Sequence, residues 1–234
     1  MGWGPSEYRY TVYPSYAITP PARRGLRFSR EEYKHVLLAV GALIAAFTLA
    51  FLNLLAGPPY PGAQDIARIV IGATVAVVTG FFLHELAHKA LAQRYGAWAE
   101  FRSSRTGLIF AIVTGFIGIV FAAPGAVYIA GPLSREQNGK VSLIGPLTNF
   151  GIALVSLGAW SALGGFFGAD VWFYLGAALF FTAYINAFLG VFNMLPVPPL
   201  DGSKVFAWNV PLWAASIVGM GAVLAAFLLR LFLP

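Results

Sequence analysis

The chain has 234 residues, of which 59% are hydrophobic and only 10% are charged. Soluble domains typically carry about 25% charged residues, so this composition excludes an ordinary soluble protein and indicates an integral membrane protein in contact with a lipid bilayer. The absence of cysteine excludes disulfide bonds and thiolate metal ligands, and the net charge of +6 fits basic residues at span ends rather than a nucleic-acid partner.

Residues 1–34 form a polar and aromatic segment with several tyrosines and arginines. We interpret it as a cytoplasmic juxtamembrane arm that lies on anionic lipid headgroups. Alternating residues from Tyr8 to Tyr13 also allow a short strand there. His35 follows at the membrane edge, where we expect it to be solvated rather than to bind a metal. The remaining residues, 35–234, are expected to form one intramembrane domain.

Five apolar stretches are long enough to cross a bilayer as helices. They lie at about residues 35–55, 66–93, 141–162, 171–195 and 211–233. Most lysines and arginines flank these stretches on one side, whereas the turns near Gly57 and Gly164 contain none. Because the basic side of a membrane protein is normally cytoplasmic, we expect a multi-pass protein of the cell membrane with a cytoplasmic N-terminus.

Residues 107–131 are also apolar, but glycine and proline interrupt them. Both ends of this segment lie on the basic side, so it must cross the membrane an even number of times. We predict a re-entrant element, either a hairpin of strands or a broken helix, enclosed by protein or lining a water-filled cavity. A tight pair of spans is the alternative. The predicted fold is therefore an all-α polytopic membrane protein with five to seven transmembrane helices and a re-entrant or β-hairpin element.

The second apolar stretch ends in the sequence His-Glu-Leu-Ala-His, residues 84–88. Histidines four residues apart share one face of a helix, so His84 and His88 can hold one metal ion with Glu85 beside them. Two interfacial histidines with a snorkelling glutamate are the alternative. The metal interpretation is favoured because the chain has only three histidines, and because a carboxylate within a span costs about 2.5–3.5 kcal/mol and is functional by default.

A catalytic zinc usually has three protein ligands and leaves a fourth position for water. Few carboxylates are available to join the two histidines. Asp65 and Asp170 begin spans on the opposite side, whereas Asp201 follows the fourth stretch at the same depth as the histidines. Asp201 is therefore the best candidate for the third ligand. The alternative is that it caps a local Pro-Leu-Asp-Gly turn.

Three motifs in this order resemble those of the site-2 protease family of intramembrane metalloproteases. The H-E-x-x-H motif lies at His84–His88, G-P-x-x-N at Gly145–Asn149, and N-x-x-P-x-x-x-x-D-G at Asn193–Gly202. The resemblance covers the chain from the second to the fourth apolar stretch.

The resemblance implies a zinc metalloendopeptidase with one Zn²⁺ per chain. It implies His84, His88 and Asp201 as metal ligands and Glu85 as the catalytic base. Four further motif residues would bind substrate or support the ligands, and these are Asn149, Asn193, Pro196 and Gly202. An ordinary interhelical hydrogen bond is the alternative role for each asparagine. The implied substrate is the transmembrane helix of another membrane protein.

Two other functions are compatible with a polytopic protein of this composition. A membrane metal transporter would require polar groups across the full depth of the bilayer, whereas here they gather on one side. A catalytically inactive relative that only binds membrane helices would be expected to lack Glu85 or a metal ligand, and none is missing. The sequence therefore favours the protease.

Overall fold

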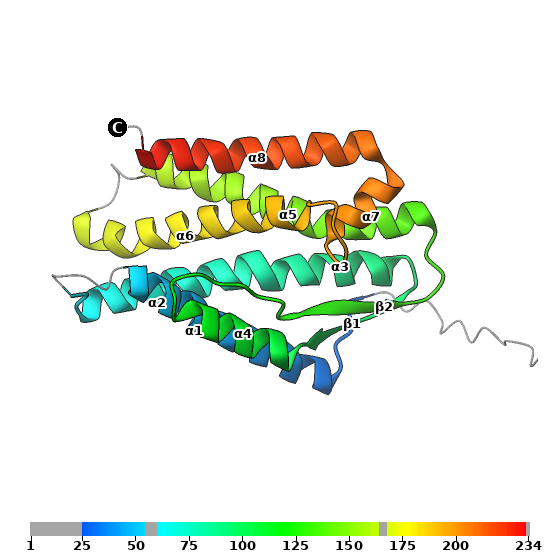
Figure 1. Ribbon diagram of the computed structural model, residues 1–234, viewed down its shortest axis with the longest axis horizontal. Coiled ribbons are helices and arrows are strands. Elements are labelled where there is room, and N and C mark those ends of the chain that lie inside the picture. Colours follow the sequence, from blue (N-terminus) through cyan, green and yellow to red (C-terminus); the bar gives the residue numbers. More distant parts are fainter. Residues whose placement is uncertain (1–24, 55–59, 164–167, 233–234) are drawn as a thin grey trace, which may run out of the picture.

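The computed structural model describes residues 25–54, 60–163 and 168–232. Its long helices lie side by side in a bundle (Figure 1). A small antiparallel pair of strands, called the hairpin from here on, and a short helix lie at one end. Within the described residues, five helical segments are long and apolar enough to cross a membrane. They are Arg30–Asn53, Ala63–Arg94, Arg135–Leu163, Ala169–Asn193 and Val210–Leu229. The predicted all-α polytopic fold is confirmed, and polar first turns extend the first and third segments beyond the apolar stretches.

The second span consists of three helical pieces in one continuous run. Helix α2 (Ala63–Val77) leads into a π-helical turn, η1 (Val78–Phe82), and then into α3 (Leu83–Arg94). Single π-turns within α-helices are frequent at functional sites. Here the π-turn comes directly before the two histidines of α3.

Four helices form the second half of the bundle. They are α5 (Arg135–Leu163), α6 (Ala169–Asn193), α7 (Asp201–Trp208) and α8 (Val210–Phe232). Helix α5 packs against α3, α6 and α7, so it lies at the centre of the contacts that surround α3. A core cluster of Leu143, Met194, Val205 and Met220 joins α5, α7 and α8.

The interrupted segment between the second and third spans is a re-entrant element. After strand β1 (Trp98–Ser103), helix α4 (Arg105–Gly115) runs along the first helix, α1 (Arg30–Leu54), and the chain then returns to strand β2 (Gly125–Ala130). Eleven residues of helix span about 16 Å, which is too short for a hydrocarbon core of about 30 Å. The re-entrant prediction is confirmed, and the alternative pair of spans is wrong (Figure 1).

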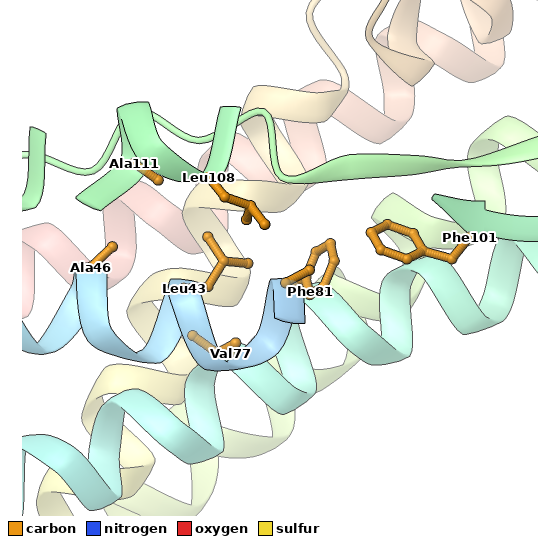
Figure 2. Close-up of a cluster of buried hydrophobic side chains, with 8 residues drawn as sticks. Leu43, Ala46, Val77, Phe81, Phe101, Leu108 and Ala111 are labelled. Carbon is orange, nitrogen blue, oxygen red and sulfur yellow. The ribbon is translucent and has the colours of Figure 1, made fainter. Parts of the chain in front are cut away.

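The re-entrant helix is held by close packing on α1. Leu108 and Ala111 of α4 lie against Leu43 and Ala46 of α1, as Figure 2 shows. A Cβ atom at Gly115 would come within 2.6 Å of the carbonyl oxygen of Ala46, so the two backbones approach too closely for a larger residue. The opposite face of α4 is apolar and exposed, which suits a surface in contact with lipid tails.

The strands β1 and β2 pair antiparallel in the register Phe101 with Val127. The side chain of Phe101 is buried against Phe81 of η1, with ring centroids 5.4 Å apart (Figure 2). The hairpin is therefore anchored on the span that carries the histidines.

The predictions for the N-terminal segment have mixed outcomes. The possible strand from Tyr8 to Tyr13 lies outside the described residues. Helix α1 begins at Arg30, within the predicted arm. His35 is half-buried rather than solvated, because its Nδ1 lies 2.7 Å from Ser103 Oγ of β1.

Candidate metal centre

Helix α3 presents His84 and His88, one turn apart, to the interior of the bundle. Both are buried, and their Nε2 atoms lie 2.9 Å apart. The Oδ2 atom of Asp201, at the start of α7, lies 3.3 Å from His84 Nε2 and 3.0 Å from His88 Nε2. Donor atoms around a tetrahedral zinc, at bonds of 2.0–2.2 Å, lie about 3.3 Å apart. The separations therefore match those of three ligands around one ion.

The other ring nitrogens determine where the protons lie. His88 Nδ1 is 2.6 Å from the carbonyl oxygen of Val141, which can only accept, so Nδ1 carries the hydrogen. His84 Nδ1 bonds Asn149 Oδ1 in the same way. Neutral rings in these tautomers direct two Nε2 lone pairs toward a carboxylate oxygen with no hydrogen between them. Such a convergence of three acceptors is favourable only around a cation, so the residues fit a metal ion.

Asn149 of α5 is fully buried, and its orientation is fixed by two acceptors. Its Nδ2 donates to the carbonyl oxygen of Gly80 at 2.8 Å and to Asn186 Oδ1 at 3.0 Å. The oxygen end of the amide must therefore face His84. The structure places this predicted site residue behind a metal-ligand candidate rather than in an open cleft.

Sequence reasoning missed Asn186, which lies on α6 and is also fully buried. Its Nδ2 donates to Thr79 Oγ1 at 3.0 Å and to the carbonyl oxygen of Thr182 at 2.9 Å, and its Oδ1 accepts from Asn149. A polar chain thus runs from Thr79 of η1 through both asparagines to His84. The available signal was an asparagine in the middle of an apolar span, where polar residues are costly and functional by default.

Gly145 of α5 lies directly over the two histidine rings. A Cβ atom there would come within 2.7 Å of His84 Nε2 and would also collide with His88 Nε2. Only glycine allows the α5 backbone to cover the converging nitrogens. The motif indicated this position, but only the geometry gives the reason for it.

Asp201 is brought to the histidines by a tight connection between α6 and α7. A Cβ atom at Gly202 would collide with the carbonyl oxygen of Met194, so the start of α7 folds directly onto the end of α6. A cation held between the two neutral histidine rings would favour the ionised form of Asp201, because a carboxylate is the form that binds a metal ion.

Glu85 occupies a different side of α3 from the histidines. Its Oε2 accepts a hydrogen bond from the backbone N–H of Val127 at 3.1 Å. The candidate base thus lies between the metal cluster and the edge of strand β2.

Two predicted site residues make no described contact with this cluster. The Nδ2 of Asn193 donates to the carbonyl oxygen of Leu189, one turn earlier in α6. Pro196 is exposed in the connection that leads to α7. Substrate-binding roles for these two residues stay predictions.

The chain is similar to a peptidase family and to proteins named as zinc metalloproteases. Residues 168–213 match the model of the family described as peptidase family M50. The chain is 40% identical over 200 residues to "Putative zinc metalloprotease MJ0611" of Methanocaldococcus jannaschii, covering 83% of this chain and 92% of that relative. It is 28% identical over 155 residues to "Putative zinc metalloprotease YwhC" of Bacillus subtilis, covering 58% of this chain and 68% of that one. No solved structure matches the chain.

Proposed function

The chain belongs to peptidase family M50, the site-2 protease family of zinc metalloproteases, and from this premise we propose that it cleaves peptide bonds within or near transmembrane helices of membrane-protein substrates. Its five apolar helices make it a multi-pass membrane protein. The observation that carries the proposal is the convergence of His84, His88 and Asp201 inside the bundle. The neighbouring residue on α3, Glu85, is a carboxylate that bonds the edge of strand β2.

We assign the metal-ligand role to His84, His88 and Asp201. A zinc ion bound there would act as a Lewis acid and lower the pKa of its water to about 7. Asn149 and the carbonyl of Val141 hold the two rings in the tautomers that offer Nε2. Such supporting bonds typically contribute about 10–100-fold to metal affinity or activity.

Glu85 is assigned as the general base. Because Val127 occupies Oε2, the other carboxylate oxygen is left to take the proton of the attacking water. Glu85 then delivers this proton to the leaving amine. We propose that water reaches the buried ligands from the end of the molecule that carries the hairpin and α7.

Strand β2 is suited to bind an unwound substrate. Phe101 donates its N–H to Glu32 rather than to β2. Phe101 and Val127, which are opposite each other, are therefore a non-hydrogen-bonded pair of the ladder. In such a pair the N–H and carbonyl of Val127 point away from β1. The outer edge of β2 therefore faces Glu85 and can pair with an extended peptide. Pairing would offset the cost of unwinding a helix in lipid.

Orientation and domain organisation follow from the same proposal. From the distribution of basic residues we infer that the hairpin, α7 and the metal cluster face the cytoplasm and that the protein lies in the cell membrane. We propose residues 35–234 as the protease domain and residues 1–34, the last of which begin α1, as the cytoplasmic segment that precedes it.

The test is reconstitution of the purified protein in liposomes with a single-span fusion protein whose artificial leucine-alanine span contains one Gly-Pro pair. We expect one zinc per chain and cleavage by the wild type. Glu85→Gln should retain zinc and lose cleavage about 10²–10⁴-fold. A protein that binds zinc without cleaving any single-span probe, in the wild type as in the variant, would exclude the protease and favour a helix-binding protein.

A further inference from the structure

A fully buried ion pair lies one helical turn beyond the candidate base. Lys89 of α3 pairs its Nζ with Glu32 Oε2 of α1, and each of the two residues is only 1% exposed. The ammonium also lies 4.2 Å from the centroid of the Phe28 ring. Among the ion pairs of the described residues, this is the one in which both side chains are buried. Burying two charges is costly, so stability alone is a poor reason for the pair.

The second oxygen of Glu32 extends this pair to the hairpin. Glu32 Oε1 accepts the backbone N–H of Phe101 in β1 at 3.0 Å. Phe101 is opposite Val127 in β2, and the N–H of Val127 bonds Glu85. The contacts form a closed circuit that leaves α3 at Lys89, passes through α1, β1 and β2, and returns to α3 at Glu85.

Packing alone does not fill the space between α3 and the hairpin. A small cavity lies there, and its lining includes Glu85, Lys89, Glu32, Phe101 and Val127. The polar contacts of the circuit therefore act together with the packing of Phe101 on Phe81 to set the distance between the strand edge and the base.

We propose that Glu32 and Lys89 are positioning residues for Glu85, because they hold the hairpin at the distance at which the Val127 N–H fixes the carboxylate beside the metal cluster. The pair itself touches neither substrate nor metal. This inference rests on the proposed function, in which Glu85 is the base. Misplacement of a catalytic group by about 1 Å costs about 100-fold in rate, so a small shift of the hairpin is enough to matter.

The test compares two double variants that each remove one negative and one positive charge. Glu32→Leu with Lys89→Met replaces the buried pair by apolar residues of similar volume. Glu31→Leu with Lys34→Met removes an exposed pair of α1, the helix that also carries Glu32, and serves as the matched control. In this pair Lys34 Nζ lies 2.7 Å from Glu31 Oε1. Measurements on each are kcat and KM for the single-span probe in liposomes, zinc affinity by chelator competition, and amide hydrogen exchange across residues 125–130.

We expect the buried-pair variant to lose kcat about 10–100-fold, with KM and zinc affinity within about twofold of wild type. Exchange in β2 should be faster, and the control should match the wild type in every measurement. Wild-type kcat and wild-type exchange in the buried-pair variant would overturn the proposal. Equal losses of zinc affinity and kcat would overturn it as well, because they indicate general damage to the fold.

Glu32→Gln provides a second variant that is less disruptive to folding. Phe101 and Lys89 bond different oxygens of Glu32, and a glutamine puts an NH₂ group, which only donates, in place of one of them, so one of the two bonds is lost. We expect an intermediate loss of kcat, and a wild-type value would contradict the proposal. Hydrogen exchange does not depend on cleavage. If the wild type cleaves no probe, the proposed function fails, whereas the positioning of the hairpin is still decided by the exchange rates.

Discussion

The two faces of helix α3 are held in different ways. On one face, His84 and His88 contact helices on their Nδ1 side, and every partner lies within a packed bundle. On the other face, Glu85 and Lys89 contact the edge of a strand and the first turn of α1 across a small cavity. The metal side is therefore held by helices of the packed bundle, whereas the base side depends on the position of the hairpin.

The difference matches the two tasks of a metalloprotease. Metal ligands must hold a fixed geometry throughout the reaction, so they benefit from helices whose tautomer-setting bonds are buried. A substrate must enter beside the base, so that side requires a surface that can adjust. Each prediction below perturbs one face and measures both, beginning with the largest expected effect.

His88→Ala should remove the metal and all activity. The variant deletes one of three converging donors, so we expect the zinc content to fall from one per chain to near zero and cleavage to become undetectable. His35→Ala is the matched control, because His35 bonds Ser103 of the hairpin rather than the cluster. Full zinc content in His88→Ala would show that the ion, if any, binds elsewhere.

Gly145→Ala should damage the metal face by a single methyl group. The added Cβ would collide with both Nε2 atoms, so we expect a loss of zinc affinity of about 100-fold and an overpacking cost of about 1–3 kcal/mol. Gly151→Ala, six residues later in α5, is the matched control because a Cβ atom there would meet only open space. Chelator competition and thermal unfolding measure the two effects. A variant with unchanged affinity would mean that α5 does not cover the site so closely.

Asn186→Leu should weaken zinc binding about tenfold, because it acts on His84 only through Asn149. Removal of Oδ1 leaves the Asn149 amide with one acceptor, Gly80, so its oxygen is less firmly directed at the ring. Asn193→Leu is the control, because the bond made by Asn193 stays within its own helix. Equal zinc affinities in the two variants would remove Asn186 from the metal face.

The sequence predicted which three donors converge, because few residue types can bind zinc. With no cysteine and three histidines, the spacing of His84 and His88 and the depth of Asp201 left few alternatives. Apolar length likewise predicted the five spans. Asn186 was missed because no spacing rule joins it to Asn149, which is 37 residues away in the chain.

The base face was predicted poorly because its contacts depend on tertiary structure. Lys89 was only counted among the basic residues on the cytoplasmic side of the apolar stretches, whereas it is buried against Glu32, 57 residues earlier. The glycine-broken segment indicated a re-entrant element. Its division into α4 and β2 depends on packing against α1 and pairing with β1, which composition does not specify.

Ile129→Pro should produce the smallest effect, confined to substrate binding on the base face. Ile129 lies opposite Ala99, and the carbonyl oxygen of Ala99 accepts from Gln93 rather than from β2. Ala99 and Ile129 are therefore a non-hydrogen-bonded pair, and the Ile129 N–H points outward, away from β1. Proline there removes one edge donor and shortens a side chain that packs on the buried cluster around Ala92 and Val141, while it spares the ladder and the bond between Val127 and Glu85. The loss of one hydrogen bond, about 0.5–1.5 kcal/mol, predicts a rise in KM of roughly 2- to 12-fold with unchanged kcat and zinc affinity.

Tyr128→Pro is the contrasting variant, because Glu100 and Tyr128 form a hydrogen-bonded pair and proline there breaks the hairpin itself. It should lower kcat as well as raise KM, since the displaced strand no longer holds Glu85. Kinetics on the single-span probe in liposomes separate the two variants. If Ile129→Pro cleaves with wild-type KM, the outer edge of β2 does not pair with substrate, and the adjustable side of α3 must admit the peptide by another surface.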